Sequence, residues 1–248
     1  SNQMNENAST KLYVFDCGEI TVKDISLFSP GVDVGKSKTL ANTCYLIMHP
    51  QGNLLWETGL NDGLVAMKNG KEIADGMFHL RVNKTLSSQL LKLGLQPKDI
   101  DYVALSHLHF DHTGNTNLFT NAKVLIQQQE LDLAYTKEGA KLYFDASSYS
   151  EIERGNFTGL VGETDVFNDG SVIIYPAQGH TPGHQTLLVN LAETGSVMLS
   201  GDLFHFTKNR LHKRIPALNF NKADSLSSIE HIEQIVKDNG VKLWIQHD

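Results

Sequence analysis

Four potential metal ligands lie within six consecutive positions of this 248-residue chain, and no other feature constrains its fold and chemistry as strongly. They are His107, His109, Asp111 and His112. They follow the apolar residues 102–105, a pattern typical of a short β-strand. Neutral imidazole and carboxylate suit zinc and other first-row transition metals. The segment therefore predicts a metal site at the end of a strand.

The spacing of these residues favours two metal ions. In an extended segment His107, His109 and Asp111 point to one side, whereas His112 points to the other. If residues 113–115 turn into a helix, His112 lies near its start and aims in a different direction. Two ligand directions at one strand end suit a pair of ions, and a metal with open coordination positions generates hydroxide near neutral pH.

Three further candidate ligands each follow an apolar run, where the end of a strand would place them. They are His180, Asp202 and His247, which follow the runs at 171–176, 197–201 and 241–245. The two oxygens of the Asp202 carboxylate can bridge a pair of cations. An isolated pair of histidines is often structural, but this arrangement of ligands favours a metal site.

In this order the residues resemble the metallo-β-lactamase superfamily, whose dinuclear members carry a His-x-His-x-Asp-His motif and later His, Asp and His ligands. Within it the chain is most similar to the N-acyl-homoserine lactonases, in residues 12–18, 107–115, 179–185 and 246–248. The likeness spans essentially the whole chain. It implies an α+β fold, the four-layer αββα sandwich, formed by residues 1–248 as one domain. The hydrophobic pattern alone indicates only mixed α and β structure.

The resemblance also implies how the ligands divide. One metal would be bound by His107, His109 and His180, and the other by Asp111, His112 and His247, with Asp202 bridging them. We expect two divalent ions, with zinc as the default and iron, manganese or cobalt as alternatives for the same donors. Only the first histidine of the segment 180–184 matches a family ligand. His184 is therefore expected to have a supporting role.

Two positions depart from the family pattern. Glu57 stands where the family usually has an aspartate before Thr-Gly, and the longer side chain leaves its role open. His205 stands where these lactonases tend to place a tyrosine near the substrate carbonyl. An imidazole can still donate a hydrogen bond, so His205 stays a candidate for substrate contact.

The predicted function is a metal-dependent hydrolase that opens the lactone ring of N-acyl-homoserine lactones, as in quorum quenching. A hydroxide bridging the metals would attack the carbonyl, with Asp111 and His205 as the catalytic residues that manage protons. A thioesterase of the glyoxalase-II type and a catalytically inactive metal-binding relative are the alternatives. A β-lactamase is less favoured because the dinuclear lactamases lack an aspartate at the bridging position.

Two irregular stretches, residues 61–84 and 136–162, carry apolar side chains among polar residues and glycines. Long irregular segments often shape binding sites, so we hypothesise that they wall a groove for the acyl chain. Ordinary packing of loops onto the sandwich is the alternative. The predicted substrate contacts are Met67, Met77, Phe78 and His205.

Charge and composition limit the partners. A net charge of −7 disfavours nucleic acid, because phosphate binding depends on Lys and Arg. No apolar run has membrane-spanning length, and residues 1–7 lack the features of a secretory signal, so a cytoplasmic protein is expected, with a removed leader left open. The expected partner is a small acyl lactone, and a homodimer is left open.

Cys17 and Cys44 are expected to be buried free thiols, with a disulfide left open.

The expected elements are mixed rather than strictly alternating. One helix is expected near 86–93 and another near 225–238, with Asp224 as its N-cap and residues 239–240 as its stop. Strands are expected near 11–16, 44–49, 53–57, 101–105, 123–127, 171–176, 185–191, 196–200 and 241–245.

Overall fold

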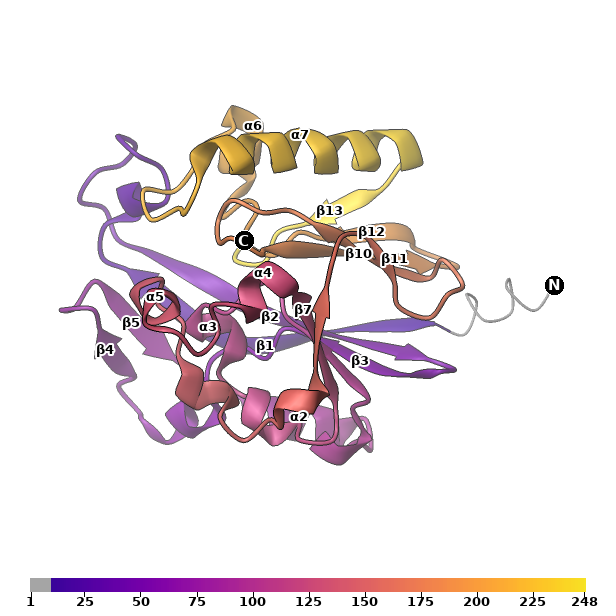
Figure 1. The fold of residues 1–248 in the computed structure, drawn as a ribbon. Coiled ribbons are helices and arrows are strands. Elements are labelled where there is room, and N and C mark those ends of the chain that lie inside the picture. Colours follow the sequence, from indigo (N-terminus) through magenta and orange to yellow (C-terminus); the bar gives the residue numbers. More distant parts are fainter. Residues whose placement is uncertain (1–9) are drawn as a thin grey trace.

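The computed structural model describes residues 10–248, whose strands form two sheets packed against each other (Figure 1). The larger sheet has eight strands in the order β4-β5-β1-β2-β3-β6-β7-β8. Its strands are β1 (Lys11–Val22), β2 (Lys38–His49), β3 (Gly52–Trp56), β4 (Lys71–Ile73), β5 (Phe78–Arg81), β6 (Tyr102–Ala104), β7 (Lys123–Gln127) and β8 (Phe157–Leu160). The smaller sheet has five strands in the order β13-β12-β11-β10-β9. Its strands are β9 (Thr164–Asp165), β10 (Val172–Pro176), β11 (Gln185–Leu191), β12 (Gly195–Leu199) and β13 (Lys242–Trp244).

Helices cover the outer faces of both sheets, with α7 over the smaller sheet and α2 beneath the larger one (Figure 1). The α-helices are α2 (Leu86–Lys92), α3 (Phe110–Thr113), α4 (Gln128–Leu131), α5 (Lys137–Lys141), α6 (Thr207–His212) and α7 (Lys222–Asn239). The 3-10 turns are η1 (Ile25–Leu27), η2 (Asp62–Ala66), η3 (Pro97–Asp99), η4 (Thr116–Leu118), η5 (Ala146–Tyr149) and η6 (Arg154–Asn156). The expectation that residues 1–7 contain no secretory signal concerns residues outside the described range.

Alternation along the strands produces the layers. In β2 the adjacent side chains of Leu46 and Ile47 are both fully buried, because they point to opposite faces of the sheet. Leu46 belongs to the core that includes α2, and Ile47 to the core between the two sheets. A third core lies between the smaller sheet and α7, where Ile232 and Val236 are buried. The four-layer αββα sandwich is confirmed.

The long C-terminal helix begins earlier than expected. Its N-cap is Asn221, whose side-chain oxygen accepts a hydrogen bond from the Asp224 N–H at 3.0 Å, so the expectation of Asp224 as the cap is wrong. Asp224 instead lies in the first turn, where a negative charge is favourable. The expected stop is confirmed at Gly240, whose left-handed backbone ends the helix.

The two stretches expected to be irregular are partly regular. Residues 61–84 contain the β4–β5 hairpin, which extends the larger sheet by pairing β5 with β1. Residues 136–162 contain α5 and β8, and β8 pairs in parallel with β7. The expectation was wrong here because these elements are short and lack a long periodic pattern.

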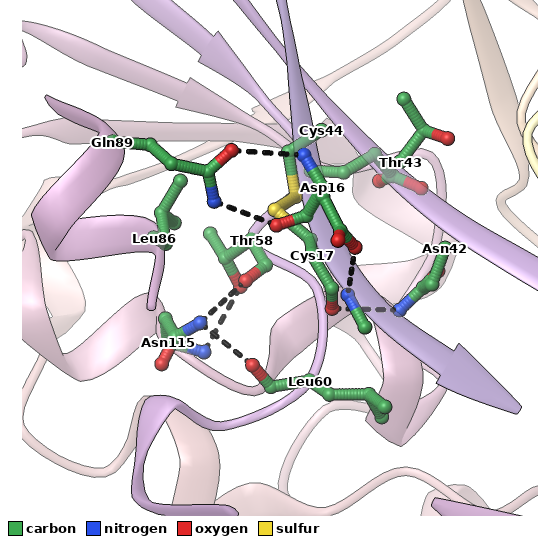
Figure 2. Close-up of a disulfide and its surroundings, with 12 residues drawn as sticks. Asp16, Cys17, Asn42, Thr43, Cys44, Thr58, Leu60, Leu86, Gln89 and Asn115 are labelled. Atoms are coloured by element: carbon green, nitrogen blue, oxygen red, sulfur yellow. Dashed lines mark hydrogen bonds between the residues drawn. A yellow bond between two sulfur atoms is a disulfide. The ribbon is translucent and has the colours of Figure 1, made fainter. Parts of the chain in front are cut away.

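The strands β1 and β2 are joined covalently (Figure 2). Cys17 and Cys44 form a disulfide with their Cα atoms 5.9 Å apart, so the expectation of free thiols is wrong. The β1–β2 register shifts between Asp16 and Glu19, the segment that contains Cys17. The Gln89 amide hydrogen-bonds both the N–H and the carbonyl of Asp16, which ties α2 to the same strand. No helix of residues 10–248 combines the length and the apolar character that a membrane span needs.

Candidate metal centre

The four clustered ligands divide between a loop and a helix. His107 and His109 lie in the loop after β6, whereas Asp111 and His112 lie in α3. The expectation of an extended backbone through Asp111, with a helix only after the cluster, is therefore wrong. The N–H and the hydroxyl of Thr58 both donate to the His112 carbonyl at 2.9 Å, which docks α3 against the loop after β3.

Seven buried or largely buried side chains converge in two groups that share one carboxylate. The first cluster is His107, His109, His180 and Asp202, and the second cluster is Asp111, His112, His247 and Asp202. Within each cluster the possible ligand atoms all lie within 4.8 Å of one another. The folding thus brings together the residues expected as ligands, in the grouping implied by the resemblance, from four separate parts of the chain.

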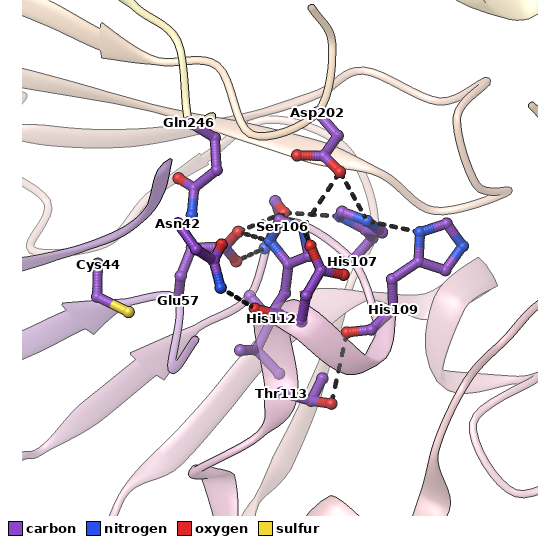
Figure 3. Close-up of polar contacts among 12 residues, drawn as sticks. Asn42, Cys44, Glu57, Ser106, His107, His109, His112, Thr113, Asp202 and Gln246 are labelled. Atoms are coloured by element: carbon purple, nitrogen blue, oxygen red, sulfur yellow. Dashed lines mark hydrogen bonds and ion pairs between the residues drawn. The ribbon is translucent and has the colours of Figure 1, made fainter. Parts of the chain in front are cut away.

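Asp202 belongs to both clusters. Figure 3 shows its carboxylate facing His107 and His112. Its Oδ2 is 3.1 Å from Nε2 of His112 and 3.5 Å from Nε2 of His107. The same oxygen lies 3.3 Å from Nε2 of His180, while Oδ1 lies 2.9 Å from Nε2 of His247. Each cluster therefore faces an oxygen of one carboxylate, as a bridging ligand requires.

The donor set fits divalent cations. Imidazole nitrogens and carboxylate oxygens suit zinc and its neighbours. Both ring nitrogens of His180 are buried, and among the described residues neither makes a hydrogen bond of good geometry, although Nε2 lies 3.3 Å from Asp202 Oδ2. A buried polar atom without a partner is costly, and a bound cation at this position would satisfy it.

The clusters differ in electrostatics. Burial and the neighbouring imidazoles lower the pKa of His107 well below its usual value, and burial lowers the pKa of His109 to about 3. In the second cluster burial also acts against protonation, but the surrounding carboxylates raise the pKa of His112 well above its usual value. Against the same burial, Asp202 raises the pKa of His247. Without metal, the pKa directions therefore favour neutral imidazoles at His107 and His109 and protonated ones at His112 and His247.

The structure shows what the longer side chain of Glu57, whose role the sequence left open, contacts (Figure 3). The fully buried carboxylate contacts Nδ1 of His112 directly. It also accepts hydrogen bonds from the N–H and hydroxyl of Ser106, at 2.7 and 2.8 Å. The Ser106 hydroxyl in turn lies 2.7 Å from Nδ1 of His107. One carboxylate therefore orients a ligand of each cluster, leaving their Nε2 atoms toward Asp202.

Glu130 is a second buried support, and the sequence analysis missed it. Its carboxylate accepts hydrogen bonds from the Leu108 N–H (3.0 Å), the Thr181 hydroxyl (2.8 Å) and the Gly183 N–H (2.9 Å). It therefore joins the loop that carries His107 and His109 to the loop that carries His180. Burial raises the pKa of Glu130. Its sequence setting, a run of Gln and Glu at 127–130, resembles a solvated helix and carries no signal of this role.

His184 supports the bridging carboxylate without joining either cluster. Its Nδ1 lies 3.0 Å from the Ala177 carbonyl, so Nε2 is free to accept the Asp202 N–H at 3.0 Å. A side chain on Gly201 would collide with His184 Nε2, 2.8 Å from the position of a Cβ atom. The glycine therefore permits the close approach that places Asp202.

A cavity of about 870 Å³ opens above the clusters. Its floor includes members of both clusters and His205, and its lining also includes Met77 and Phe78. Met67 does not line it and is 46% exposed. The His205 ring is buried and stacks on Phe28, with ring centroids 4.4 Å apart.

Comparison with known proteins decides the family. A family model described as the metallo-beta-lactamase superfamily matches residues 38–238. The chain belongs to the metallo-β-lactamase superfamily. Its relatives in this superfamily include N-acyl homoserine lactonases of Bacillus thuringiensis and Bacillus cereus. Each is 28% identical, over 96% of this chain and 93% of the relative.

Solved structures show the same metallo-β-lactamase fold. A mutant of the Bacillus thuringiensis lactonase AiiA, with N-decanoyl-L-homoserine bound at its active site, superposes with a TM-score of 0.83. It is 27% identical and covers 96% of this chain and 93% of its own. A structure of an N-acyl homoserine lactone hydrolase with N-hexanoyl-L-homoserine at its catalytic metal centre gives a TM-score of 0.82 at 27% identity, with the same coverage of both chains.

Proposed function

We propose that this protein is an N-acyl-homoserine lactonase, a hydrolase that opens the lactone ring and so acts in quorum quenching. The observation that carries the proposal is the pair of ligand clusters sharing Asp202 on the floor of a cavity with apolar walls. The 28% identity to N-acyl homoserine lactonases over 96% of the chain supports the choice of substrate.

Two divalent cations are the proposed cofactors, one held by each cluster with Asp202 in contact with both. Zinc is the default, and iron, manganese or cobalt suit the same donors. When bound, the ions would supply Lewis acidity, which would lower the pKa of water and polarise the lactone carbonyl. Glu57 and Ser106 keep the ligand imidazoles oriented for this role.

The residues of the chain itself orient the substrate and manage protons. Attack by water on the carbonyl releases a proton, and ring opening leaves an alkoxide oxygen that must gain one. We assign the transfer of this proton to Asp111 and His205, which both line the cavity. Stacking on Phe28 holds His205 with its Nε2 3.6 Å from Asp202 Oδ2, at the edge of the metal centre. Met77 and Phe78 are proposed to contact the acyl chain, and the apolar walls limit the access of bulk water.

A titration assay tests the reaction class. Metal-loaded protein is given N-acyl-homoserine lactones of several lengths, a glutathione thioester and a β-lactam, and acid release is followed at constant pH. Acid release from the lactones alone, abolished by a chelator and restored by zinc, is the expected result. Acid release from the thioester alone would assign the site to a thioesterase, and no turnover of any substrate would indicate a metal-binding relative.

We also propose how the chain acts and assembles. Residues 1–248 are proposed to act as one hydrolase domain on a small molecule, either alone or as a homodimer. Light scattering on a size-exclusion column separates the two states. The net charge of −7 argues against nucleic acid as a partner.

A further inference from the structure

The Cys17–Cys44 disulfide has no role in the function proposed above, yet its surroundings connect it to the second cluster. Both cysteines are buried, with exposed fractions of 2% and 0%. They lie at a bulge, where Cys17 and Gly18 of β1 together face the single residue Asn42 of β2. A bulge interrupts the strand ladder, so the Cys17 carbonyl is available to partners outside it. These partners are the Asn42 amide and the Leu60 N–H.

Asn42 joins the disulfide to a ligand of the second cluster (Figure 2). Its buried amide nitrogen donates to the Cys17 carbonyl at 3.4 Å and to the Asp111 carbonyl at 2.8 Å. An amide nitrogen carries two hydrogens, so it serves both acceptors at once. A movement of Cys17 is therefore transmitted through one side chain to the backbone of Asp111.

The part of β2 that precedes Cys44 holds a second ligand. The Ala41 carbonyl lies 2.9 Å from Nδ1 of His247. The Thr43 carbonyl accepts a hydrogen bond from the Gln246 amide, next to His247 in the chain. The orientation of His247 therefore depends on where this short stretch of β2 lies.

The helix α3, which carries His112, is also packed onto the disulfide, through Gly59. A Cβ atom on Gly59 would lie 2.3 Å from Cβ of Cys17 and 3.2 Å from Sγ of Cys44, so the glycine backbone packs directly against the bridge. The Gly59 carbonyl accepts the Gly114 N–H at 2.8 Å, which fixes the end of α3. Each protein segment that carries a histidine of the second cluster is thus held by residues that surround the disulfide.

The first cluster is supported elsewhere. Glu130 joins its two loops through bonds to Leu108, Thr181 and Gly183. None of these three bonds involves a residue that contacts the disulfide. A change at the disulfide should therefore act on the second cluster before the first.

Breaking the disulfide changes the geometry at this point. Two thiol sulfurs in contact lie farther apart than two bonded sulfurs, and the Gly59 backbone leaves little space around them. Either the strands or Gly59 must shift to accommodate the thiols. Such a shift reaches the second cluster through Asn42 and α3.

We propose that the Cys17–Cys44 disulfide is a positioning element of the second cluster, and that its reduction weakens metal binding there while the first cluster keeps its metal. This proposal rests on the two-metal centre proposed above, but not on the lactone as substrate. Loss of a residue that orients metal ligands typically weakens metal binding by about 10- to 100-fold. We expect about tenfold, because reduction leaves every ligand and every supporting hydrogen-bonding group in the chain.

The test compares the metal content and affinity of the oxidised and reduced protein, by elemental analysis and chelator competition. The reductant is a water-soluble phosphine, since thiol reductants bind zinc themselves. The phosphine takes the oxygen of water and becomes a phosphine oxide, and the two sulfurs gain two electrons and two protons. The oxidised protein should hold two ions, and reduction should weaken one of them by about tenfold. Oxidised glutathione, which takes the two electrons back and leaves as two thiols, should restore the affinity.

Two variants assign the weakened ion to a cluster. In His180→Ala the tightly bound ion that remains belongs to the second cluster, and its affinity should fall on reduction. In His247→Ala the remaining ion belongs to the first cluster, and reduction should not change its affinity. The control is Thr21→Ala, which removes an exposed hydrogen bond of 2.8 Å to Thr39 between the same two strands. It should bind both ions as the native protein does.

The double variant Cys17→Ala/Cys44→Ala should bind metal like the reduced protein and should not respond to the phosphine. A disulfide also stabilises the whole fold, so all affinities are measured well below the melting temperature of each form. If the double variant does not fold, the reversible change in the native protein decides.

Several outcomes would overturn the proposal. Unchanged affinity of both ions after reduction would do so, and so would a parallel loss from both clusters, which indicates general destabilisation. Two thiols that persist in the purified protein after treatment with oxidant would also overturn it. The measurement does not depend on turnover. A second ion that responds to reduction in a protein without lactone hydrolysis would therefore refute the lactonase function and support the positioning role.

Discussion

The first and second clusters share Asp202, but different parts of the fold support them. The second cluster is held by the larger sheet: the Asn42 amide of β2 donates to the Asp111 carbonyl at 2.8 Å, and the Ala41 carbonyl lies 2.9 Å from Nδ1 of His247. The first cluster depends on loops joined by Glu130. One cluster is thus supported mainly by a sheet, and the other mainly by two loops that the buried carboxylate of Glu130 joins.

Loss of Asp202 should have the largest effect, because both clusters contain this residue. In Asp202→Ala both clusters lose a ligand, so elemental analysis should show a loss of both metals. The expected decrease in kcat/KM is on the order of 10³-fold or more, since metal ions lower the reaction barrier by several kcal/mol. Asp238→Ala, an exposed change on α7, serves as the control. Retention of one tightly bound metal and full activity would contradict the shared role.

Acidification should separate the clusters. A metal binds an imidazole only after the proton has left, so a raised pKa makes metal binding compete with protons over more of the pH range. The pKa values of His112 and His247 are raised, whereas those of His107 and His109 are lowered. From about pH 8 to about pH 6 the second cluster should lose affinity by about tenfold per pH unit for each proton displaced, while the first changes little. Metal stoichiometry across this range measures it, and simultaneous loss from both clusters would disprove the difference.

Two buried carboxylates offer a matched pair of substitutions. Glu57→Ala removes the direct partner of His112 and should weaken metal binding by about 10- to 100-fold, most strongly at the second cluster, because Glu57 reaches His107 only through Ser106. Glu130→Ala leaves the Thr181 hydroxyl and two N–H groups without their partner, at about 1–3 kcal/mol of stability for each buried group left unsatisfied. Its metal loss should fall on the first cluster. Competitive titration with a chromogenic chelator and urea unfolding measure both, and identical metal losses in the two variants would contradict separate supports.

The cavity walls should give the smallest effect. Phe78→Ser changes the wall beside the second cluster and should raise KM for long acyl chains by a few-fold, because less apolar surface is buried on binding. Met67→Ser provides the comparison, since Met67 lies nearby in the sequence but does not line the cavity. Equal changes in KM for the two variants would show that the lining residues do not select the chain.

The sequence alone was sufficient for the fold class and for the candidate ligands that the structure brings together. The ligand chemistry is concentrated in one short segment and three isolated strand ends, so His107 and Asp202 are recognisable from local context. The αββα sandwich followed from the resemblance. The helix near residue 225 was expected because its apolar spacing is periodic. Its N-cap is Asn221, three residues before the expected cap Asp224.

Only the tertiary structure revealed which buried side chains support the two clusters and which residues line the cavity. Glu57 reaches His112 and Glu130 joins two loops through approaches between residues about 50 positions apart, which no local pattern encodes. The Cys17–Cys44 bridge joins two strands across 27 positions of sequence, and it too became visible only in the structure. Which residues are able to bind a metal follows from side-chain chemistry, so candidate ligands can be recognised in short segments of sequence. Ligand orientation and the shape of the cavity depend on which distant backbones pack together, and that is decided when the sheets and loops fold.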